Sequence, residues 1–329
     1  WRRTRDPYAI WLSEIMLQQT QVNRVLNYYE EFLAAFPTVE ALSRARLERV
    51  LRLWSGLGYY RRAENLHKAA RQLIGAHGGK LPQDYGQLRA LAGIGDYTAG
   101  AILSIAFHKP YPAIDGNARR VLGRIFAFAG ERELRAGALK LVPKTNPGEF
   151  NQALMELGAT ICAPKKPRCP DCPVKLQCAS LNRKHPLSAK SKRPQMRVVK
   201  ILWPLAILRR RGKILLRRRS ADRLLAGLWE LPGVTLKRAA KRGELPAILS
   251  RELPLPSSGA RLIGEFEHAI THRRIRAPVY LFECTAQSTA RLARTRWRWS
   301  RPARLSEHAV SSMTLKAAKL LADHEARLR

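Results

Sequence analysis

Four of the chain's five cysteines lie in one short segment, at Cys162, Cys169, Cys172 and Cys178, with the spacing C-x6-C-x2-C-x5-C. Four prolines in the same segment predict a loop, which offers little apolar surface to bury free thiols. Four thiolates can hold a tetrahedral zinc ion or a four-iron four-sulfur cluster. A structural zinc site usually joins two C-x2-C pairs, and this segment has one. The spacing therefore favours a 4Fe-4S cluster over zinc and over four free structural cysteines.

The rest of the sequence divides into two regions of different periodicity. In residues 1–182, apolar residues recur every three or four positions, which predicts an all-α domain that includes the cysteine loop. Residues 183–200 hold seven basic residues, no acidic residue and two prolines, as a solvated linker would. Residues 201–329 predict an α+β domain. Its expected strands are Ile201–Leu208, Lys213–Arg217, Arg261–Phe266 and Pro278–Cys284, and its expected helices are Ala239–Arg251 and Met313–Leu328.

The charge of the chain indicates the kind of partner. Sixty Lys and Arg residues against 25 Asp and Glu give a net charge of +35, which attracts polyanions and favours nucleic acid through counterion release. Lys165, Lys166 and Arg168 lie between the first two clustered cysteines, where a cluster would hold them toward a phosphate. The longest apolar run is too short to cross a bilayer. We therefore expect double-stranded DNA and no membrane as partner.

Three further expectations concern the state of the protein. One tight cysteine cluster in a long chain fits a reducing compartment, so we expect a cytoplasmic protein, bacterial and associated with the nucleoid through DNA. Nothing in the sequence indicates a symmetric interface, so we expect a monomer. The chain begins at Trp1 rather than at methionine, so we expect further residues, and any targeting signal, upstream.

A glycine-containing turn predicts a contact with phosphate. Gly93 and Gly95 lie between two helical patterns, in the stretch LAGIGDYTAG at residues 91–100. Such a helix–hairpin–helix turn presents backbone N–H groups and a helix N-terminus to an anion without reading a base. A G-x-G turn alone also fits an ordinary helical hairpin, and the cysteine loop downstream favours the DNA-binding interpretation.

Two carboxyl groups stand out as candidates for catalysis. Asp115 precedes a helix expected at residues 118–128, where it can serve as an N-cap or stabilise a cationic sugar, as a carboxylate does in glycoside hydrolysis. Glu14 shares an apolar helix face with Ile10 and Leu17, where desolvation would raise its pKa and let it act as a general acid. An exposed position at the helix edge is the other interpretation of Glu14. Together the two provide what cleavage between a base and its sugar requires.

At this point the sequence resembles the helix–hairpin–helix, iron–sulfur DNA glycosylases, specifically those of the MutY type. The resemblance covers nearly the whole chain, in WLSEIMLQQTQV at residues 11–22, LWSGLGYYRRAENLHKAA at 53–70, LAGIGDYTAGAI at 91–102, IDGNARRV at 114–121 and FNQALMELGATIC at 150–162. These proteins remove adenine mispaired with 8-oxoguanine or guanine in DNA, so the resemblance implies that Glu14 protonates adenine. It also implies that Asp115 acts at the sugar with help from Asn117.

The resemblance also implies DNA contacts and a limit on the chemistry. Gln19 and Tyr59 should enter the duplex near the lesion while the base is flipped out, and Gln152 should lie near the adenine pocket. Relatives that also cut the backbone have a lysine at position 97, because Schiff-base chemistry needs an amine. Tyr97 therefore predicts a monofunctional glycosylase, although it can also be a core aromatic under the hairpin.

The second domain resembles the Nudix-like module of the same family. A working Nudix box needs a set of carboxylates for a divalent metal. Counted without gaps from Gly233, its positions hold Ala239, Ala247, Ile248, Arg251 and Glu252. Pyrophosphate hydrolysis is therefore not expected.

Two departures from the family pattern concern DNA contacts. The family reads 8-oxoguanine through a Phe-Ser-His loop, for which this chain has Ile270, Thr271 and His272. The hydroxyl and the imidazole are kept and the aromatic ring is lost, so Thr271 and His272 remain candidates for DNA binding. Ala92 stands where the family has proline in the hairpin.

Three alternatives remain open from the sequence. One is a pyrimidine-specific glycosylase and lyase of the endonuclease III type, which Tyr97 and the second domain disfavour. Another is a catalytically silent iron–sulfur protein that binds DNA, which the presence of both Glu14 and Asp115 disfavours. A nucleotide-pool hydrolase is the third, and the incomplete Nudix box disfavours it.

Overall fold

The computed structural model describes residues 4–128, 130–182, 198–220, 227–236, 240–253, 259–284 and 296–327. Residues 183–197 of the predicted linker lie outside this description. Contacts divide the chain into two compact units. The first, here called the helical unit, comprises Trp1–Ala45 and Arg61–Arg193; the second, the sheet unit, comprises Arg46–Tyr60 and Pro194–Arg329. The sheet unit thus includes a short segment from the first part of the sequence.

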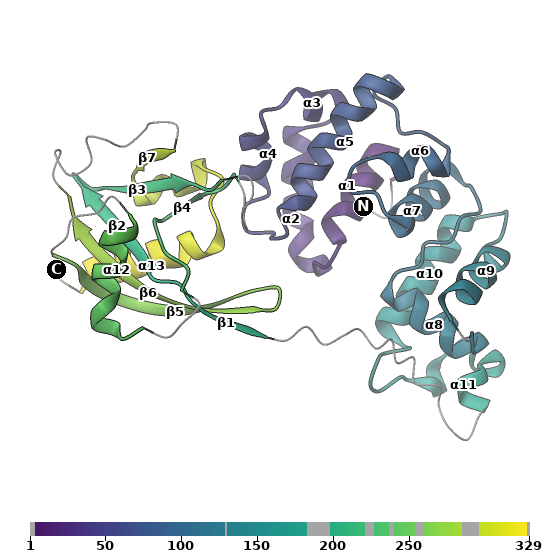
Figure 1. The fold of residues 1–329 in the computed structure, drawn as a ribbon. Helices are drawn as coiled ribbons and strands as arrows, with labels where there is room; N and C mark the ends of the chain where they lie inside the picture. The colour runs from purple at the N-terminus through teal and green to yellow at the C-terminus, as the bar shows by residue number, and fades with distance from the viewer. Residues whose placement is uncertain are drawn as a thin grey trace. The chain divides into compact units, whose positions relative to one another are not determined.

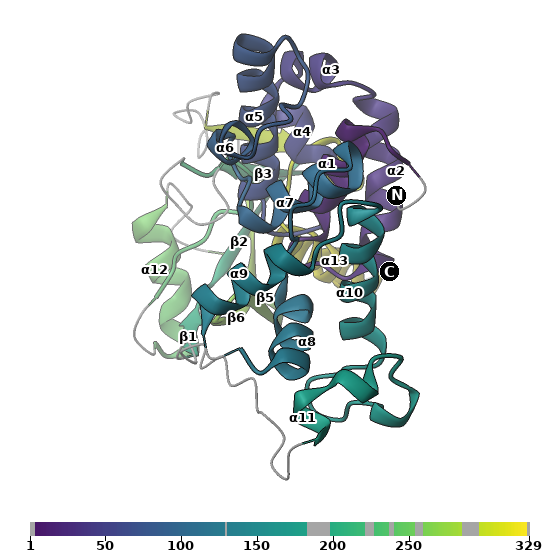
Figure 2. The same cartoon turned by 90° about the vertical axis from the view of Figure 1, so that its right-hand side faces the viewer.

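The helical unit confirms the prediction of an all-α domain (Figure 1). Asp6 caps its first helix by accepting the backbone N–H groups of Tyr8 and Ala9, and Pro7 occupies the first turn. The helices that follow are α1 (Pro7–Leu17), α2 (Val22–Ala35), α3 (Val39–Arg44), α5 (Arg61–His77), α6 (Tyr85–Ala90), α7 (Asp96–Phe107), α8 (Gly116–Phe126), α9 (Glu131–Leu141), α10 (Pro147–Thr160) and α11 (Ala179–Asn182). Helices α8 and α10 pack side by side, and the cysteine loop follows α10 (Figure 2).

The sheet unit has a mixed sheet, as the α+β prediction requires. In the described residues its strands are β1 (Val199–Leu202), β2 (Leu205–Arg210), β3 (Lys213–Arg218), β4 (Trp229–Glu230), β5 (Arg261–Ile270), β6 (Arg273–Glu283) and β7 (Trp297–Ser300). The strand order is β1-β6-β2-β3-β4, with β5 paired to β6 and β7 paired to β3. Strand β6 runs parallel to β1 and β2 and antiparallel to β5.

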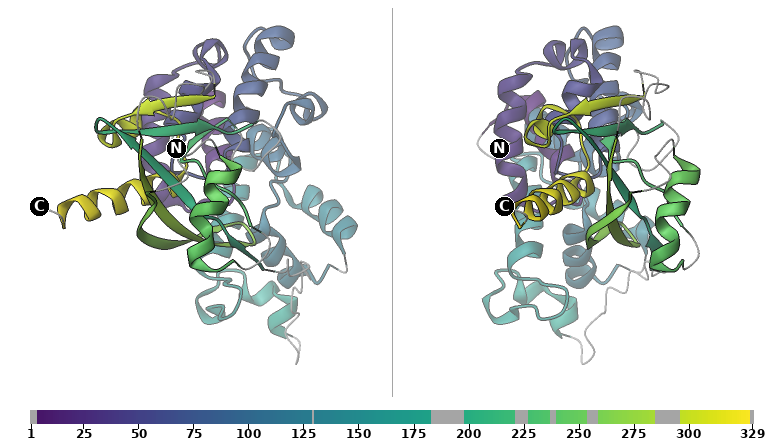
Figure 3. Two further views of the ribbon diagram at one scale, coloured as in Figure 1. Left: turned by 60° about the vertical axis from the view of Figure 1, so that its left-hand side comes forward. Right: turned by 90° about the vertical axis from the view of Figure 1, so that its left-hand side faces the viewer.

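Two helices cover opposite faces of this sheet (Figure 3). Alternate residues of a strand point to opposite faces, so Leu205 and Ile207 of β2 pack with helix α13 (Ser312–Ala326), while Ala206 and Leu208 pack with helix α12 (Leu245–Glu252). A third helix, α4 (Leu47–Leu53), belongs to the segment from the first part of the sequence. The sheet therefore has a buried core on each side.

Three local predictions need correction. The run expected as one strand from Ile201 to Leu208 is two strands, because Pro204 lacks the N–H that a continuous ladder needs. Lys200, expected in the linker, lies in β1. The helix expected from Ala239 begins instead with a 3-10 turn at Arg242–Glu244 followed by α12, and Ala239 lies outside the described residues.

No helix in the described part of the chain combines the length and the apolar character that crossing a bilayer requires.

Candidate active site

A buried carboxyl group lies between α1 and α7. Glu14 is on α1 and only 6% exposed. The hydroxyl of Tyr97, in the first turn of α7, donates a hydrogen bond of 2.6 Å to its Oε2 atom. The same hydroxyl lies 3.6 Å from the Sδ atom of Met155 on α10. Glu14 is therefore inside the helical unit rather than at an exposed helix edge, and Tyr97 contacts it directly.

The sequence explains why Glu14 is buried. Every residue of α1 from Tyr8 to Met16 is buried, so this helix is covered on all sides and carries its carboxyl group into the interior. Arg62 of α5 ends the helix, because its Nη1 atom donates to the carbonyls of Ile15, Met16 and Gln18 at 2.6–3.0 Å.

Arg62 also holds the turn that follows α1. Its Nη2 atom donates to the Thr20 hydroxyl at 3.0 Å. Gln19 lies between these contacts, exposed, with a φ of 58°. Gln19 is thus exposed on a turn that the Arg62 side chain holds through Gln18 and Thr20. The sequence analysis did not identify Arg62 as a functional residue. The one indication of its role was that it lies in the stretch at residues 53–70 that resembles the family.

Asp115 takes one of the two roles predicted for it, that of a helix N-cap, and its role at a sugar stays a prediction. Its Oδ1 atom accepts the backbone N–H of Ala118 at 2.6 Å, so it is the N-cap of α8. Burial raises the pKa of Asp115, while the backbone N–H groups of Ala118 and Asn117 and the charge of Arg120 act in the opposite direction. The Asp115 carboxyl group therefore caps α8 and is at the same time partly removed from water.

A guanidinium ties Asn117 to the start of the cysteine loop. Arg120 donates to Asn117 Oδ1 at 2.9 Å, to the Gly158 carbonyl at 2.7 Å and to the Cys162 carbonyl at 2.8 Å. Gly158 lets α10 approach α8 closely, since a Cβ atom there would lie 2.6 Å from Asn117 Cβ. Helix α10 thus contacts Tyr97 through Met155 and the Asp115 end of α8 through Gly158, which connects the surroundings of the two carboxyl groups. Arg120 is a second residue that the sequence reasoning missed.

The glycine hairpin has the geometry that its sequence predicts. Gly93 has a φ of 80°, and a Cβ atom there would lie 2.8 Å from Asn65 Cβ. Gly95 is the N-cap of α7, without a capping side chain, and both glycines are exposed. The N–H of Ala92 is not available to a phosphate, because it donates to Gln72 Oε1 at 2.9 Å. That bond fixes the turn at the position where the family has proline.

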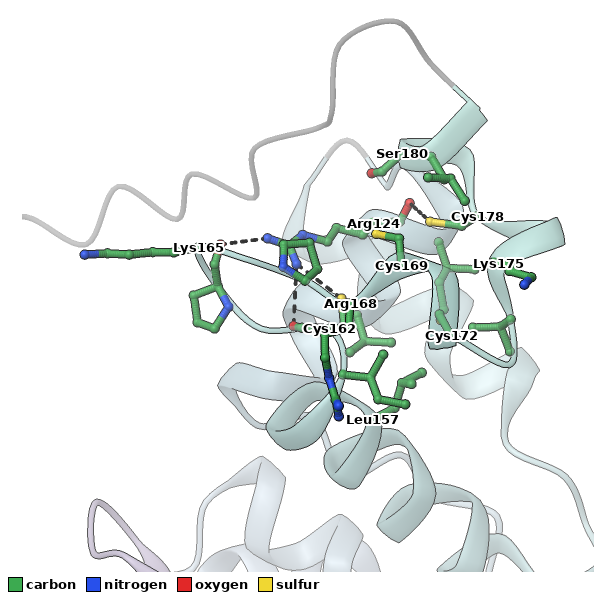
Figure 4. Close-up of a pocket in the computed structure, with 17 residues that line it drawn as sticks. Arg124, Leu157, Cys162, Lys165, Arg168, Cys169, Cys172, Lys175, Cys178 and Ser180 are labelled. Carbon is green, nitrogen blue, oxygen red and sulfur yellow. Dashed lines mark hydrogen bonds between the residues drawn. The ribbon is translucent and has the colours of Figure 1, made fainter.

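The four clustered cysteines line one cavity of about 480 Å³ (Figure 4). Their side chains come from the end of α10, from a 3-10 turn at Cys169–Asp171 and from the loop before α11. Arg124 of α8 donates to Cys162 Sγ at 3.2 Å and to the carbonyls of Ala163 and Pro164. In the described residues no three His, Cys, Asp or Glu side chains are close enough to hold a single metal ion.

The cavity suits a group larger than one ion. A single zinc ion holds four sulfur atoms at about 2.3 Å from one centre, whereas an iron–sulfur cluster places metal and sulfide atoms between its cysteines. Four cysteines around a cavity of about 480 Å³ fit the second arrangement. The basic residues Lys165, Lys166 and Arg168 are exposed beside it, as the sequence predicts for a phosphate contact.

The remaining predicted DNA contacts lie in different places. Thr271 and His272 form the two-residue turn between β5 and β6, where Thr271 is exposed with a φ of 53° and its Oγ1 atom lies 3.3 Å from His272 Nδ1. Gln152 lies on α10 and donates to its own helix at the Gly148 carbonyl. Tyr59 is 44% exposed with a φ of 49° and belongs to the sheet unit.

At the Nudix-box positions that the structure describes, no set of carboxylates is placed to hold a metal. Ala247, Ile248 and Arg251 lie on α12. The buried Glu230 beside Gly233 forms ion pairs with Arg217 and Arg219. In the described part of the sheet unit no acidic cluster is available to bind a divalent cation.

Comparison with known proteins defines the class of this chain. Residues 12–144 match the HhH-GPD superfamily of base excision DNA repair proteins, and residues 205–320 match the NUDIX domain. A solved structure described as that of a thermostable thymine-DNA glycosylase resembles the helical part, with a TM-score of 0.53 and 32% identity over 55% of this chain and 87% of that chain. The fold is thus a base excision glycosylase domain followed by a Nudix-like domain.

Relatives that align over nearly the whole of this chain identify the family. The adenine DNA glycosylase of Rattus norvegicus is 34% identical over 97% of this chain and 72% of the rat protein. The adenine DNA glycosylase of Homo sapiens is 33% identical over 96% of this chain and 68% of the human protein. The chain belongs to the adenine DNA glycosylase family, which confirms the resemblance found in the sequence.

Proposed function

We propose that this member of the adenine DNA glycosylase family excises adenine mispaired with 8-oxoguanine or guanine, with Glu14 as proton donor and Asp115 as the carboxylate at the sugar. Its general activity follows from the family: it is a DNA repair enzyme that hydrolyses the N-glycosidic bond of adenine in DNA. The observation that carries the residue assignment is the 2.6 Å hydrogen bond from Tyr97 to the buried Glu14. This bond fixes the orientation of the carboxyl group.

The chemistry divides between the two carboxyl groups. Glu14, buried and held by the Tyr97 hydroxyl, is the proposed general acid that gives a proton to a ring nitrogen of a flipped adenine. The bond between the base and C1′ then breaks, and its electron pair leaves with adenine. The negative charge of Asp115 stabilises the sugar cation, and this electrostatic interaction is strong because the site is partly desolvated. Water adds to C1′ and releases a proton.

Asn117 and Arg120 support this arrangement without taking part in bond cleavage. Arg120 holds the Asn117 amide at 2.9 Å and anchors it to α10 and the cysteine loop. Asn117 is in the first turn of α8, two residues from the capping Asp115. The carboxylate therefore has little freedom to move away from the sugar, as electrostatic preorganisation requires.

The chemistry ends at base release. Strand cleavage through a Schiff base needs an amine that attacks C1′, and position 97 has a phenol whose hydroxyl binds Glu14. Borohydride reduces a Schiff base to a stable protein–DNA adduct. The wild-type protein should give no adduct with a DNA duplex that contains adenine opposite 8-oxoguanine, and Tyr97→Lys provides the variant with an amine in place. An adduct of the wild-type protein would contradict the monofunctional assignment.

Recognition of 8-oxoguanine is assigned to the turn between β5 and β6. Thr271 presents a hydroxyl at the exposed end of a long hairpin, with the His272 imidazole beside it. Arg273 and Arg274 follow directly and add positive charge for the phosphates. Without the ring supplied by phenylalanine in the family loop, hydrogen bonding from these two side chains carries the contact. In the described residues of the same unit no cluster of carboxylates is placed to hold a divalent metal, and the role proposed for the unit is binding.

The four clustered cysteines are proposed to hold a 4Fe-4S cluster. The support is that all four line one cavity of suitable size, with Arg124 donating to the sulfur atom of Cys162. Bound there, the cluster would hold the loop rigid and present Lys165, Lys166 and Arg168 to DNA. Iron and sulfide analysis of anaerobically purified protein should give four of each per chain. Stoichiometric zinc instead would contradict the assignment.

The proposed partner is double-stranded DNA that contains an A:8-oxoguanine or A:G mispair, bound by a monomer in the cytoplasm. The test of function is single-turnover release of adenine from duplexes with adenine opposite 8-oxoguanine, guanine or thymine. Release should be fastest opposite 8-oxoguanine. Equal rates from all three duplexes would contradict the proposed mispair specificity, and absence of release from protein with a full cluster would contradict adenine excision itself.

A further inference from the structure

A loop of the sheet unit is held by one backbone oxygen. Residues 55–60 follow α4, and both ends of this loop contact the carbonyl of Val310. Ser55 Oγ donates to that oxygen at 2.7 Å, and the Tyr60 hydroxyl donates to it at 3.2 Å. The Gly56 N–H donates in turn to the Tyr60 hydroxyl at 3.1 Å. Residues far apart in the sequence thus form one hydrogen-bonded group that closes the loop.

The backbone inside the loop has an unfavourable conformation for one of its residues. Gly56 and Gly58 have φ values of 95° and 84°, which glycine adopts easily. Tyr59 has a φ of 49°, which its Cβ atom disfavours. A residue keeps such a conformation only where its surroundings hold it there. Tyr59 is 44% exposed, and the hydrogen bonds of Ser55, Gly56 and Tyr60 hold the loop on both sides of it.

A second anchor fixes α4, which leads into the loop. Glu48 of α4 accepts a hydrogen bond of 2.9 Å from Trp229 Nε1 and pairs with Arg298 at 3.2 Å. The Arg298 guanidinium also lies 4.4 Å from the centre of the Trp229 ring. Burial acts to raise the pKa of Glu48, but the Trp229 hydrogen bond and the charge of Arg298 outweigh it, and the pKa is lowered. Glu48 is therefore held in its charged form.

The contacts that hold α4 and those that hold the loop depend on two neighbouring segments of the sheet unit. Trp229 is in β4 and forms an isolated bridge with Val310, and its N–H donates to the Ala309 carbonyl at 2.8 Å. The side chain of Trp229 therefore holds α4, while its backbone holds the segment whose carbonyl receives Ser55 and Tyr60. Movement of this segment would be passed to both ends of the loop.

We propose that the Val310 carbonyl, through Ser55 and Tyr60, positions Tyr59 for insertion into the DNA duplex. Ser55 and Tyr60 are then positioning residues and make no contact with the reacting atoms. The unit that carries Thr271 and His272, the side chains assigned to 8-oxoguanine, also holds the side chain assigned to open the duplex. This inference rests on the proposed function and extends it from the roles of single residues to the part of the chain that controls one of them.

Fluorescence of 2-aminopurine gives a direct readout of the loop. The fluorophore is placed next to the 8-oxoguanine in a duplex whose adenine carries a 2′-fluoro sugar, so that binding occurs without base release. The wild-type protein is compared with Ser55→Ala, Tyr60→Phe and Tyr59→Ala, the last of which defines the part of the signal that depends on insertion. Tyr280→Phe is the matched control, because it removes a hydroxyl that binds the Arg242 carbonyl in the same unit, away from the loop.

Loss of one hydrogen bond to the Val310 carbonyl should lower the equilibrium constant for Tyr59 insertion about fivefold. Tyr60→Phe and Ser55→Ala should both show this loss, Ser55→Thr should restore the signal, and Tyr280→Phe should match the wild type. Thermal melting checks that each variant is folded. An insertion signal equal to the wild type in both Ser55→Ala and Tyr60→Phe would overturn the inference.

The experiment separates this inference from the proposed function. Wild-type protein that releases no adenine from the unmodified duplex contradicts the proposed function. Wild-type protein that releases adenine and inserts Tyr59, with both loop variants unchanged, contradicts the positioning role alone. If Tyr59→Ala gives the same fluorescence signal as the wild type, Tyr59 is not the inserted side chain, and the inference is contradicted with it.

Discussion

Replacing Tyr97 with phenylalanine removes one hydroxyl group and leaves the aromatic ring between α1, α7 and α10. The lost hydrogen bond to Glu14 is 2.6 Å long, and it becomes charge-assisted in the transition state, where Glu14 transfers its proton to adenine and takes on negative charge. Such bonds contribute about 1.5–3 kcal/mol. Since 1.36 kcal/mol corresponds to a tenfold change in rate, a bond made fully in the transition state predicts a loss of about 10- to 150-fold in the rate of adenine release.

The assay is single-turnover release of adenine from a duplex with adenine opposite 8-oxoguanine, at enzyme concentrations that saturate the DNA. Tyr85→Phe is the matched control. It also removes a tyrosine hydroxyl that donates to a carboxylate, that of Asp96 at 3.0 Å, and it leaves the hydrogen bond to Glu14 in place. The control should stay within twofold of the wild type. A Tyr97→Phe rate equally close to the wild type would refute the view that this hydrogen bond orients the catalytic acid.

Three other predictions follow from contacts in the helical unit. Asp115→Asn keeps an oxygen that can cap α8, so adenine release should fall at least 100-fold while the melting temperature changes by less than about 2 °C; release at the wild-type rate would contradict the role of Asp115 at the sugar. Arg135, and then Tyr85 and Arg89, lower the pKa of Asp96 despite its partial burial, so its ionised form stabilises the fold above the ordinary Asp pKa. That stabilisation is lost as the pH falls through the lowered value, and the difference in melting temperature between wild type and Asp96→Asn should shrink there, which a pH series of thermal melts checks. Replacing Lys165 and Lys166 together with alanine should weaken binding to all duplexes alike and reduce the slope of log Kd against log salt by about 2; an unchanged slope would mean that these lysines do not contact phosphates.

The sequence predicted most of the helical unit because its signals are local. Helix periodicity, the Asp6–Pro7 start and the glycine hairpin each depend on neighbours within a few residues. The apolar residues on one face of α1 favoured a buried Glu14, but an exposed position at the helix edge stayed open from the sequence, and the burial of every residue from Tyr8 to Met16 decides between the two. What the sequence did not indicate is that Tyr97 contacts Glu14, because they are 83 residues apart.

Two arginines show more clearly that contacts between distant residues leave no signal in the sequence. Arg62 and Arg120 lie on helix faces that look polar in a basic sequence, where most arginines contact solvent or DNA. The structure uses both to bind backbone carbonyls at the ends of α1 and α10. Those acceptors have no signature in the sequence, since every residue has a carbonyl group.

In the sheet unit, strand boundaries were less predictable than strand existence. β4 has two residues and β7 has four with two tryptophans and an arginine, too short for an alternating pattern to be recognised. The sequence also gave no sign that residues 46–60 belong to this unit, because their helical pattern continues that of the segments around them.

The discontinuous sheet unit has a consequence for how the protein is made. During synthesis, residues 46–60 leave the ribosome 134 residues before Pro194, where the rest of their unit begins. Domains generally fold as their sequence becomes available, so the helical unit can assemble while this segment has none of its partners in β4 and β7. For that period Glu48, Ser55 and Tyr60 lack the groups that they bind in the finished protein, namely Trp229, Arg298 and the Val310 carbonyl. The loop before Tyr60 is therefore fixed only when the later part of the chain has been synthesised.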